Sequence, residues 1–232
     1  MIALVLMTAP LPLRAELVLP QVVFPPLPGQ GKAPADFVPA GWIVEEQAQA
    51  DLNGDRLPDF MMVLHMADRK NILANPDGLG AEELDTNPRM LVVGFQDRQH
   101  GFHLQVANHT LIPRHTNPVL DDPFADAEVR NGTLKISLVH WASVGSWASS
   151  QVSYTFRFQS NCFRLIGYNH EETLRNSGER TAISINYLTG KVKTSKGTIE
   201  DDALRDEWRS LRGKRKVCLE DIGDGMEFQP EL

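Results

Sequence analysis

The alternation of apolar and polar residues in the middle of the chain constrains the fold more than any other feature. In Thr133–His140, leucine and isoleucine alternate with polar neighbours, and Gln151–Phe158 repeats the pattern with valine and aromatic residues. A period of two places alternate side chains on one face of a strand, so each segment predicts a strand with one buried face. The dipeptide Asn131-Gly132, just before the first of them, predicts a tight hairpin turn.

Short apolar or alternating segments recur along much of the chain and are separated by turn residues. We expect antiparallel sheets, arranged as a sandwich or as propeller-like blades, and therefore an all-β fold. Thr189-Gly190 predicts a second hairpin. The further expected strands are Trp42–Ala48, Phe60–Met66, Met90–Phe95, Phe102–Ala107, Cys162–Tyr168, Ala182–Tyr187 and Lys191–Thr194.

One short C-terminal helix is also expected. Asp201 or Asp202 can cap it, Ala203–Leu211 is rich in helix-forming residues, and Gly213 can end it. Such a helix would be the only departure from the β pattern.

The first 15 residues begin with an apolar run and end in a small residue at Ala15. This pattern is typical of the end of a secretory signal peptide, with a buried N-terminal strand as the alternative. Residues 16–40 carry many prolines and predict an extended arm, because proline lacks the N–H that ladders and helices need. Residues 41–232 then form a single, mainly β domain.

The overall charge and the cysteines bear on the compartment and on partners. The formal net charge is -7, which disfavours nucleic acid as a partner, and no stretch has the length of a transmembrane segment. The two cysteines, Cys162 and Cys218, predict a disulfide in an oxidising compartment such as the periplasm or the extracellular space. Two buried thiols are the alternative.

The segment Asp51–Asp59, between two expected strands, contains the clearest chemical pattern. Oxygen-bearing side chains stand at loop positions one, three, five and nine, and a backbone carbonyl can fill position seven. Calcium prefers several hard oxygen ligands of this kind. The predicted Ca²⁺ ligands are Asp51, Asn53, Asp55, the Leu57 carbonyl and Asp59. An Asp/Asn-rich turn without metal is the alternative, since these residues also favour turns.

The segment from Asp51 to Phe60 resembles the calcium loops of FG-GAP and VCBS-type repeat proteins, in which such a loop joins neighbouring strands of a propeller blade. The resemblance covers about ten residues and the flanking strands. It departs from the family pattern at Arg56, where those loops usually carry glycine. A non-glycine residue forced to positive φ costs about 1 kcal/mol. The order of the remaining features is similar to that of small uncharacterised exported bacterial proteins, which implies no function.

No catalytic set stands out in the sequence. We therefore expect an exported calcium-binding β module, in which calcium has a structural role and the protein binds a partner protein of the cell envelope. The alternative is an envelope hydrolase whose site is assembled from distant residues.

Overall fold

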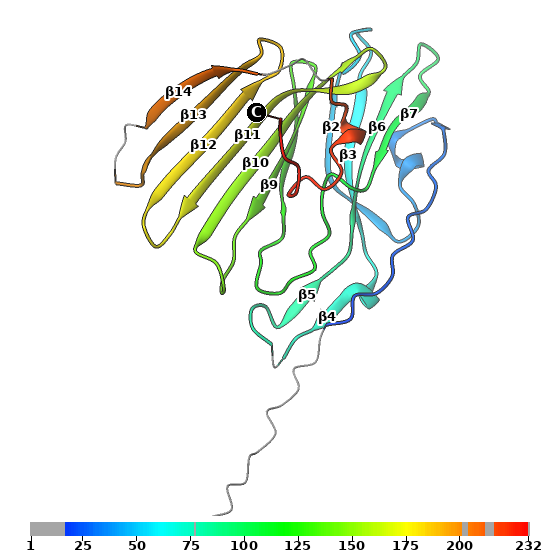
Figure 1. The fold of residues 1–232 in the computed structure, drawn as a ribbon. Coiled ribbons are helices and arrows are strands. Elements are labelled where there is room, and N and C mark those ends of the chain that lie inside the picture. Colours follow the sequence, from blue (N-terminus) through cyan, green and yellow to red (C-terminus); the bar gives the residue numbers. More distant parts are fainter. Residues whose placement is uncertain (1–16, 77, 201–203, 212–215, 232) are drawn as a thin grey trace, which may run out of the picture.

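The computed structural model describes residues 17–76, 78–200, 204–211 and 216–231 (Figure 1). The expected signal peptide, residues 1–15, lies outside this part of the chain. Within the described residues the strands form antiparallel sheets, and helical structure amounts to short 3₁₀ turns, which confirms the all-β prediction. The 3₁₀ turns are η1 (Pro34–Phe37), η2 (Arg69–Asn71) and η3 (Leu219–Asp221). No described helix is long and apolar enough to cross a membrane.

Two large sheets and one two-stranded sheet make up the fold. The first sheet has the strand order β1-β7-β6-β3-β2 and the second β14-β13-β12-β11-β10-β9-β8, while β4 and β5 pair separately. The strands of the first sheet are β1 (Gln30–Gly31), β2 (Trp42–Ala50), β3 (Asp59–Met66), β6 (Arg89–Gln96) and β7 (Phe102–Asn108). Those of the second are β8 (Phe124–Arg130), β9 (Thr133–His140), β10 (Ala148–Gln159), β11 (Cys162–Leu174), β12 (Glu179–Asn186), β13 (Lys191–Thr198) and β14 (Arg205–Ser210). The small sheet pairs β4 (Ile72–Ala74) with β5 (Glu83–Asp85).

The two large sheets share one hydrophobic core. Met61 and Val63 of β3 belong to the same buried cluster as Ile136 of β9 and Tyr154 of β10. Side chains from both sheets therefore meet between them, as in a sandwich. Apolar and polar residues alternate along β9 and β10 because one face of each strand contributes to this core.

The continuous apolar run in β3 has a different cause, because both faces of this strand are covered. Phe60, Met62 and Leu64 point away from the main core into a second buried cluster. That cluster is completed by the proline-rich N-terminal segment, which contributes the fully buried Phe37. The segment is extended over much of its length, and it lies against the first sheet and pairs with β7 through β1 (Figure 1).

Both hairpin turns occur where they are expected. Asn131 and Gly132 have φ angles of 51° and 68° and connect β8 to β9, which is the left-handed geometry of a tight two-residue hairpin. Gly190, with φ 67°, ends the connection between β12 and β13. Strand β8 was not predicted, although Ala127 and Val129 alternate with charged residues in its sequence.

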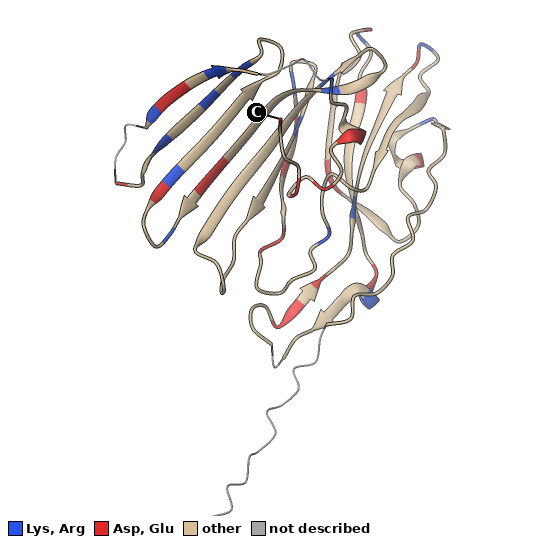
Figure 2. Cartoon of the chain, in the orientation of Figure 1, with Lys and Arg blue, Asp and Glu red and all other residues tan. Residues whose placement is uncertain are grey.

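The prediction of a C-terminal helix over Ala203–Leu211 is wrong. The described part of this segment contains β14, which pairs along its length with β13. Asp206 accepts a hydrogen bond from Ser195 and lies 2.9 Å from the ammonium nitrogen of Lys193. Pairing with a neighbouring strand therefore overrides the local preference for a helix. Figure 2 shows charged residues of both signs along these strands. The expected caps Asp201, Asp202 and Gly213 lie outside the described residues.

The disulfide between Cys162 and Cys218 is confirmed, with an S–S distance of 2.06 Å and a Cα–Cα distance of 5.9 Å. It joins the start of β11 to the C-terminal segment, residues 216–231, and the alternative of two buried thiols is wrong. The C-terminal segment then crosses the core face of the second sheet (Figure 1). There Phe228 packs against Tyr154 and Tyr168.

Candidate functional site

The loop with the candidate calcium ligands closes the hairpin between β2 and β3. Ala50 pairs with Asp59 at the ends of the two strands, so the intervening residues form a compact turn. Leu52 is buried in the main core and fixes the base of this turn. The predicted strand–loop–strand context of the motif is therefore correct.

The backbone of the loop is tightly turned, and three oxygen-bearing side chains accept hydrogen bonds from its N–H groups. Asp51 accepts hydrogen bonds from the backbone N–H of Gly54 at 2.6 Å and of Arg56 at 2.9 Å. Asn53 accepts from the N–H of Asp55, and Asp55 accepts from the N–H of Leu57. These bonds hold side chains at positions one, three and five in a single tight coil. Each of the acceptor oxygens keeps a second lone pair, which a cation can use.

Arg56 has a φ angle of 71°, in the left-handed region. This is loop position six, where FG-GAP and VCBS-type loops usually carry glycine, and a positive φ is a conformation that glycine adopts readily. A side chain in this conformation is strained by about 1 kcal/mol.

Asp59 has a different environment from the other ligand candidates, because it is fully buried. Its two carboxylate oxygens accept hydrogen bonds from the N–H of Leu52 at 2.8 Å and of Gln96 at 3.0 Å. Burial raises the pKa of the carboxyl group above its ordinary value, the two N–H groups oppose the rise, and the charge of Asp55 adds to it. Asp59 thus anchors the loop to β6.

The structure therefore places all five predicted ligand residues in one loop. Among the described residues, no three His, Cys, Asp or Glu side chains are arranged to hold a metal ion. The chemistry of the donor set fits calcium, since the available atoms are carboxylate and amide oxygens. Calcium binding remains a prediction.

Two cavities were not foreseen from the sequence, because distant segments form their walls. One, of about 500 Å³, lies between the N-terminal segment and the chain after β7, and contains Arg114 and His109. The other, of about 140 Å³, lies between the second sheet and the C-terminal segment and contains His170. Neither of these two cavities is lined by a carboxylate. No local motif surrounds Arg114 or His109, so no sequence pattern could have indicated them.

Comparisons with protein-family models, with curated proteins and with solved structures found no match for this chain. The likeness to FG-GAP and VCBS-type loops therefore rests on the residues of the β2–β3 loop themselves.

Proposed function

We propose that this protein is an exported β module that binds calcium in the Asp51–Asp59 loop and acts by binding a partner protein of the cell envelope. The observation that carries the proposal is the coil of Asp51, Asn53 and Asp55, whose oxygens converge on the loop backbone between two paired strands. The disulfide supports export to the periplasm or beyond, because such bonds persist in oxidising compartments.

In this proposal the ligand atoms of the ion come from five residues of the loop. The side chains of Asp51, Asn53 and Asp55 and the carbonyl of Leu57 supply oxygens, and Asp59 contributes directly or through water. Burial is the main cause of the raised pKa of Asp59, and a bound calcium ion compensates the repulsion from Asp55 that adds to it. Calcium thereby stabilises the β2–β3 hairpin and its link to β6, which is a structural role.

Millimolar calcium should raise the melting temperature of the protein relative to a sample in chelator. At a calcium concentration one hundred times the dissociation constant, the stabilisation is about 2.7 kcal/mol, or roughly 5–10 °C for a chain of this size. Asp51→Ala combined with Asp55→Ala should abolish the rise, because it removes two of the carboxylate ligands. Differential scanning calorimetry measures both.

A matched control removes the same charge elsewhere. Glu179 and Glu220 are exposed, and Glu179→Ala combined with Glu220→Ala should leave the calcium-dependent rise intact. Identical melting curves with calcium and with chelator would refute the proposal. So would an undiminished rise in the variant without Asp51 and Asp55.

The binding role is tested with the calcium-loaded protein as bait on native envelope extract. A partner recovered in stoichiometric amount in calcium, and lost from the double-alanine variant, would support it. A hydrolase gains no support from the two cavities described above, since neither contains the carboxylate pair that such a site could use.

A further inference from the structure

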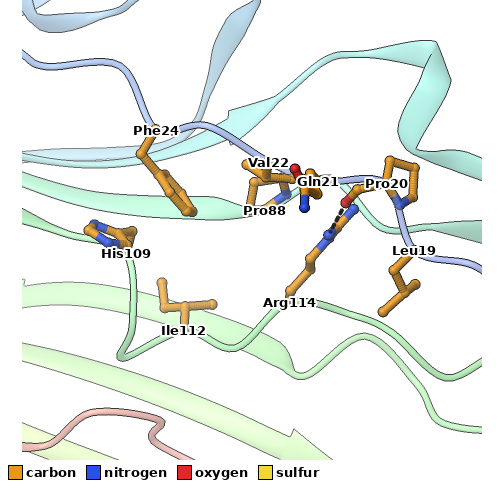
Figure 3. A pocket seen from close by; sticks show the side chains of 9 residues that line it. All are labelled: Leu19, Pro20, Gln21, Val22, Phe24, Pro88, His109, Ile112 and Arg114. Atoms are coloured by element: carbon orange, nitrogen blue, oxygen red, sulfur yellow. Dashed lines mark hydrogen bonds between the residues drawn. The ribbon is translucent and has the colours of Figure 1, made fainter.

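The larger cavity has the size and lining of a small-molecule site. Its volume of about 500 Å³ falls within the range of about 300–1,000 Å³ typical of ligand pockets. One wall comes from the N-terminal segment, and the facing wall from the chain between β7 and β8 (Figure 3). Phe24 stacks on His109 with 4.2 Å between the ring centres. The remaining lining residues are Leu19, Pro20, Gln21, Val22, Pro88, Ile112 and Arg114.

Arg114 places a positive charge in this cavity, whose lining combines polar and apolar groups. Its guanidinium donates hydrogen bonds to the carbonyl of Pro20 at 2.8 Å, to the hydroxyl of Thr86 at 2.8 Å, to the carbonyl of Thr86 and to the amide oxygen of Asn71. All of these acceptors are neutral. No described carboxylate forms an ion pair with Arg114.

Arg114 differs from the buried Arg89 in that its hydrogen-bond acceptors are neutral. Arg89 is paired with the carboxylates of Glu45 and Asp122, as buried arginines usually are. Arg114 is half-buried and has no carboxylate partner among the described residues, and burial lowers the pKa of its guanidinium. Among the described residues, the Nη1 atom of Arg114 has one acceptor, Pro20, for its two N–H groups. The second N–H of Nη1 has no acceptor within the described part of the chain, so it can donate to an anion.

We propose that this cavity binds an amphipathic carboxylate, whose acidic group pairs with Arg114 and whose apolar body lies against Phe24, Val22 and Ile112. A carboxylate matches the planar guanidinium and supplies a negative charge that the described neighbours of Arg114 lack. The apolar lining favours a ligand with a hydrocarbon body over a small inorganic anion. The site is separate from the calcium loop and does not depend on the function proposed for it.

Isothermal titration calorimetry with the full chain tests the proposal, using decanoate as the probe. Decanol has the same chain without the charge, and acetate has the charge without the chain. Both should bind at least about ten-fold more weakly than decanoate, because each lacks one of the two recognised parts. Equal binding of decanoate and decanol, or no saturable binding of decanoate at about 1 mM, overturns the proposal.

Two pairs of variants locate the binding. Arg114→Gln should weaken decanoate binding about ten-fold, whereas Arg98→Gln, at an exposed arginine, should not. Since Arg114 also anchors Pro20, a second variant fills the cavity without touching the guanidinium. Val22→Trp should block binding, and Val23→Trp, at the neighbouring residue that is 83% exposed, should preserve it. Undiminished binding in Val22→Trp would place the ligand elsewhere and reject the site.

Discussion

At the scale of single residues, some charged side chains stabilise the fold, whereas others are available to bind a ligand. Arg89 of β6 illustrates the first kind. Its guanidinium pairs with Glu45 of β2 at 2.5 Å and with Asp122, just before β8, at 2.8 Å. It also lies 5.0 Å from the centre of the Phe124 ring. The ion pairs thus join the two sheets at one edge of the shared core.

The backbone conformation of Arg56, in the candidate calcium loop, has an energetic cost that can be tested. Arg56→Gly should raise the free energy of unfolding by about 0.5 kcal/mol, because relief of the left-handed strain exceeds the entropy that glycine loses on folding. Urea denaturation measures the change. Arg98→Gly, at an exposed residue outside the left-handed region, should instead lower the free energy of unfolding by about 0.5–1 kcal/mol. Equal losses in both variants would contradict the interpretation of strain at Arg56.

At the scale of elements, the N-terminal segment forms a third layer of the fold. Phe37 is fully buried and its ring lies 5.2 Å from that of Phe60, on the face of β3 opposite the main core. The first sheet is therefore covered on both sides. This explains why β3 and β6 are apolar without alternation.

Removing the buried ring tests this layer. Phe37→Ala should destabilise the protein by about 3–5 kcal/mol, because it deletes a large side chain and leaves a cavity against Phe60. Val18→Ala, at a side chain 82% exposed, should change the stability by less than about 0.5 kcal/mol. Urea denaturation compares the two. A small effect of Phe37→Ala would show that the segment adds little to the stability of the sandwich.

The sequence-based predictions succeeded where the structure depends on neighbouring residues, and failed where it depends on residues far apart in the chain. The strands β9 and β10 and the Asn131-Gly132 turn were predictable because alternation and turn geometry are local properties. Strand β14 was not, since its contacts with Lys193 and Ser195 come from another strand. Likewise the sequence placed Asp59 in the candidate calcium loop, but not its bond to Gln96, which depends on the pairing of β3 with β6.

At the scale of the whole molecule, all three tyrosines gather on the second sheet near the C-terminal segment. Tyr154 donates a hydrogen bond to the carbonyl of Gly225, and Tyr168 contacts the ring of Tyr154. Burial raises the pKa of both phenols. It also raises the pKa of Tyr187 to about 12.

These shifts predict loss of stability in alkali. Above pH 10 the tyrosines of the unfolded chain release protons that the folded protein retains. The unfolded state then binds fewer protons, so the free energy of unfolding falls as the pH rises from about 10 to about 12. Phenolate absorbance should appear together with the loss of near-ultraviolet circular dichroism. Smooth titration near pH 10 in a protein that stays folded would contradict the burial of the tyrosines.

The division of the core between two sheets also bears on how the chain is made. The first sheet and its outer cluster are built from residues up to Asn108, whereas the members of the main core that cover Met61 and Val63 from the second sheet lie at Ala127 and beyond. While the polypeptide emerges from the ribosome, one apolar surface of that early half therefore stays bare until the later half arrives. During this interval it is a target for chaperones and for aggregation.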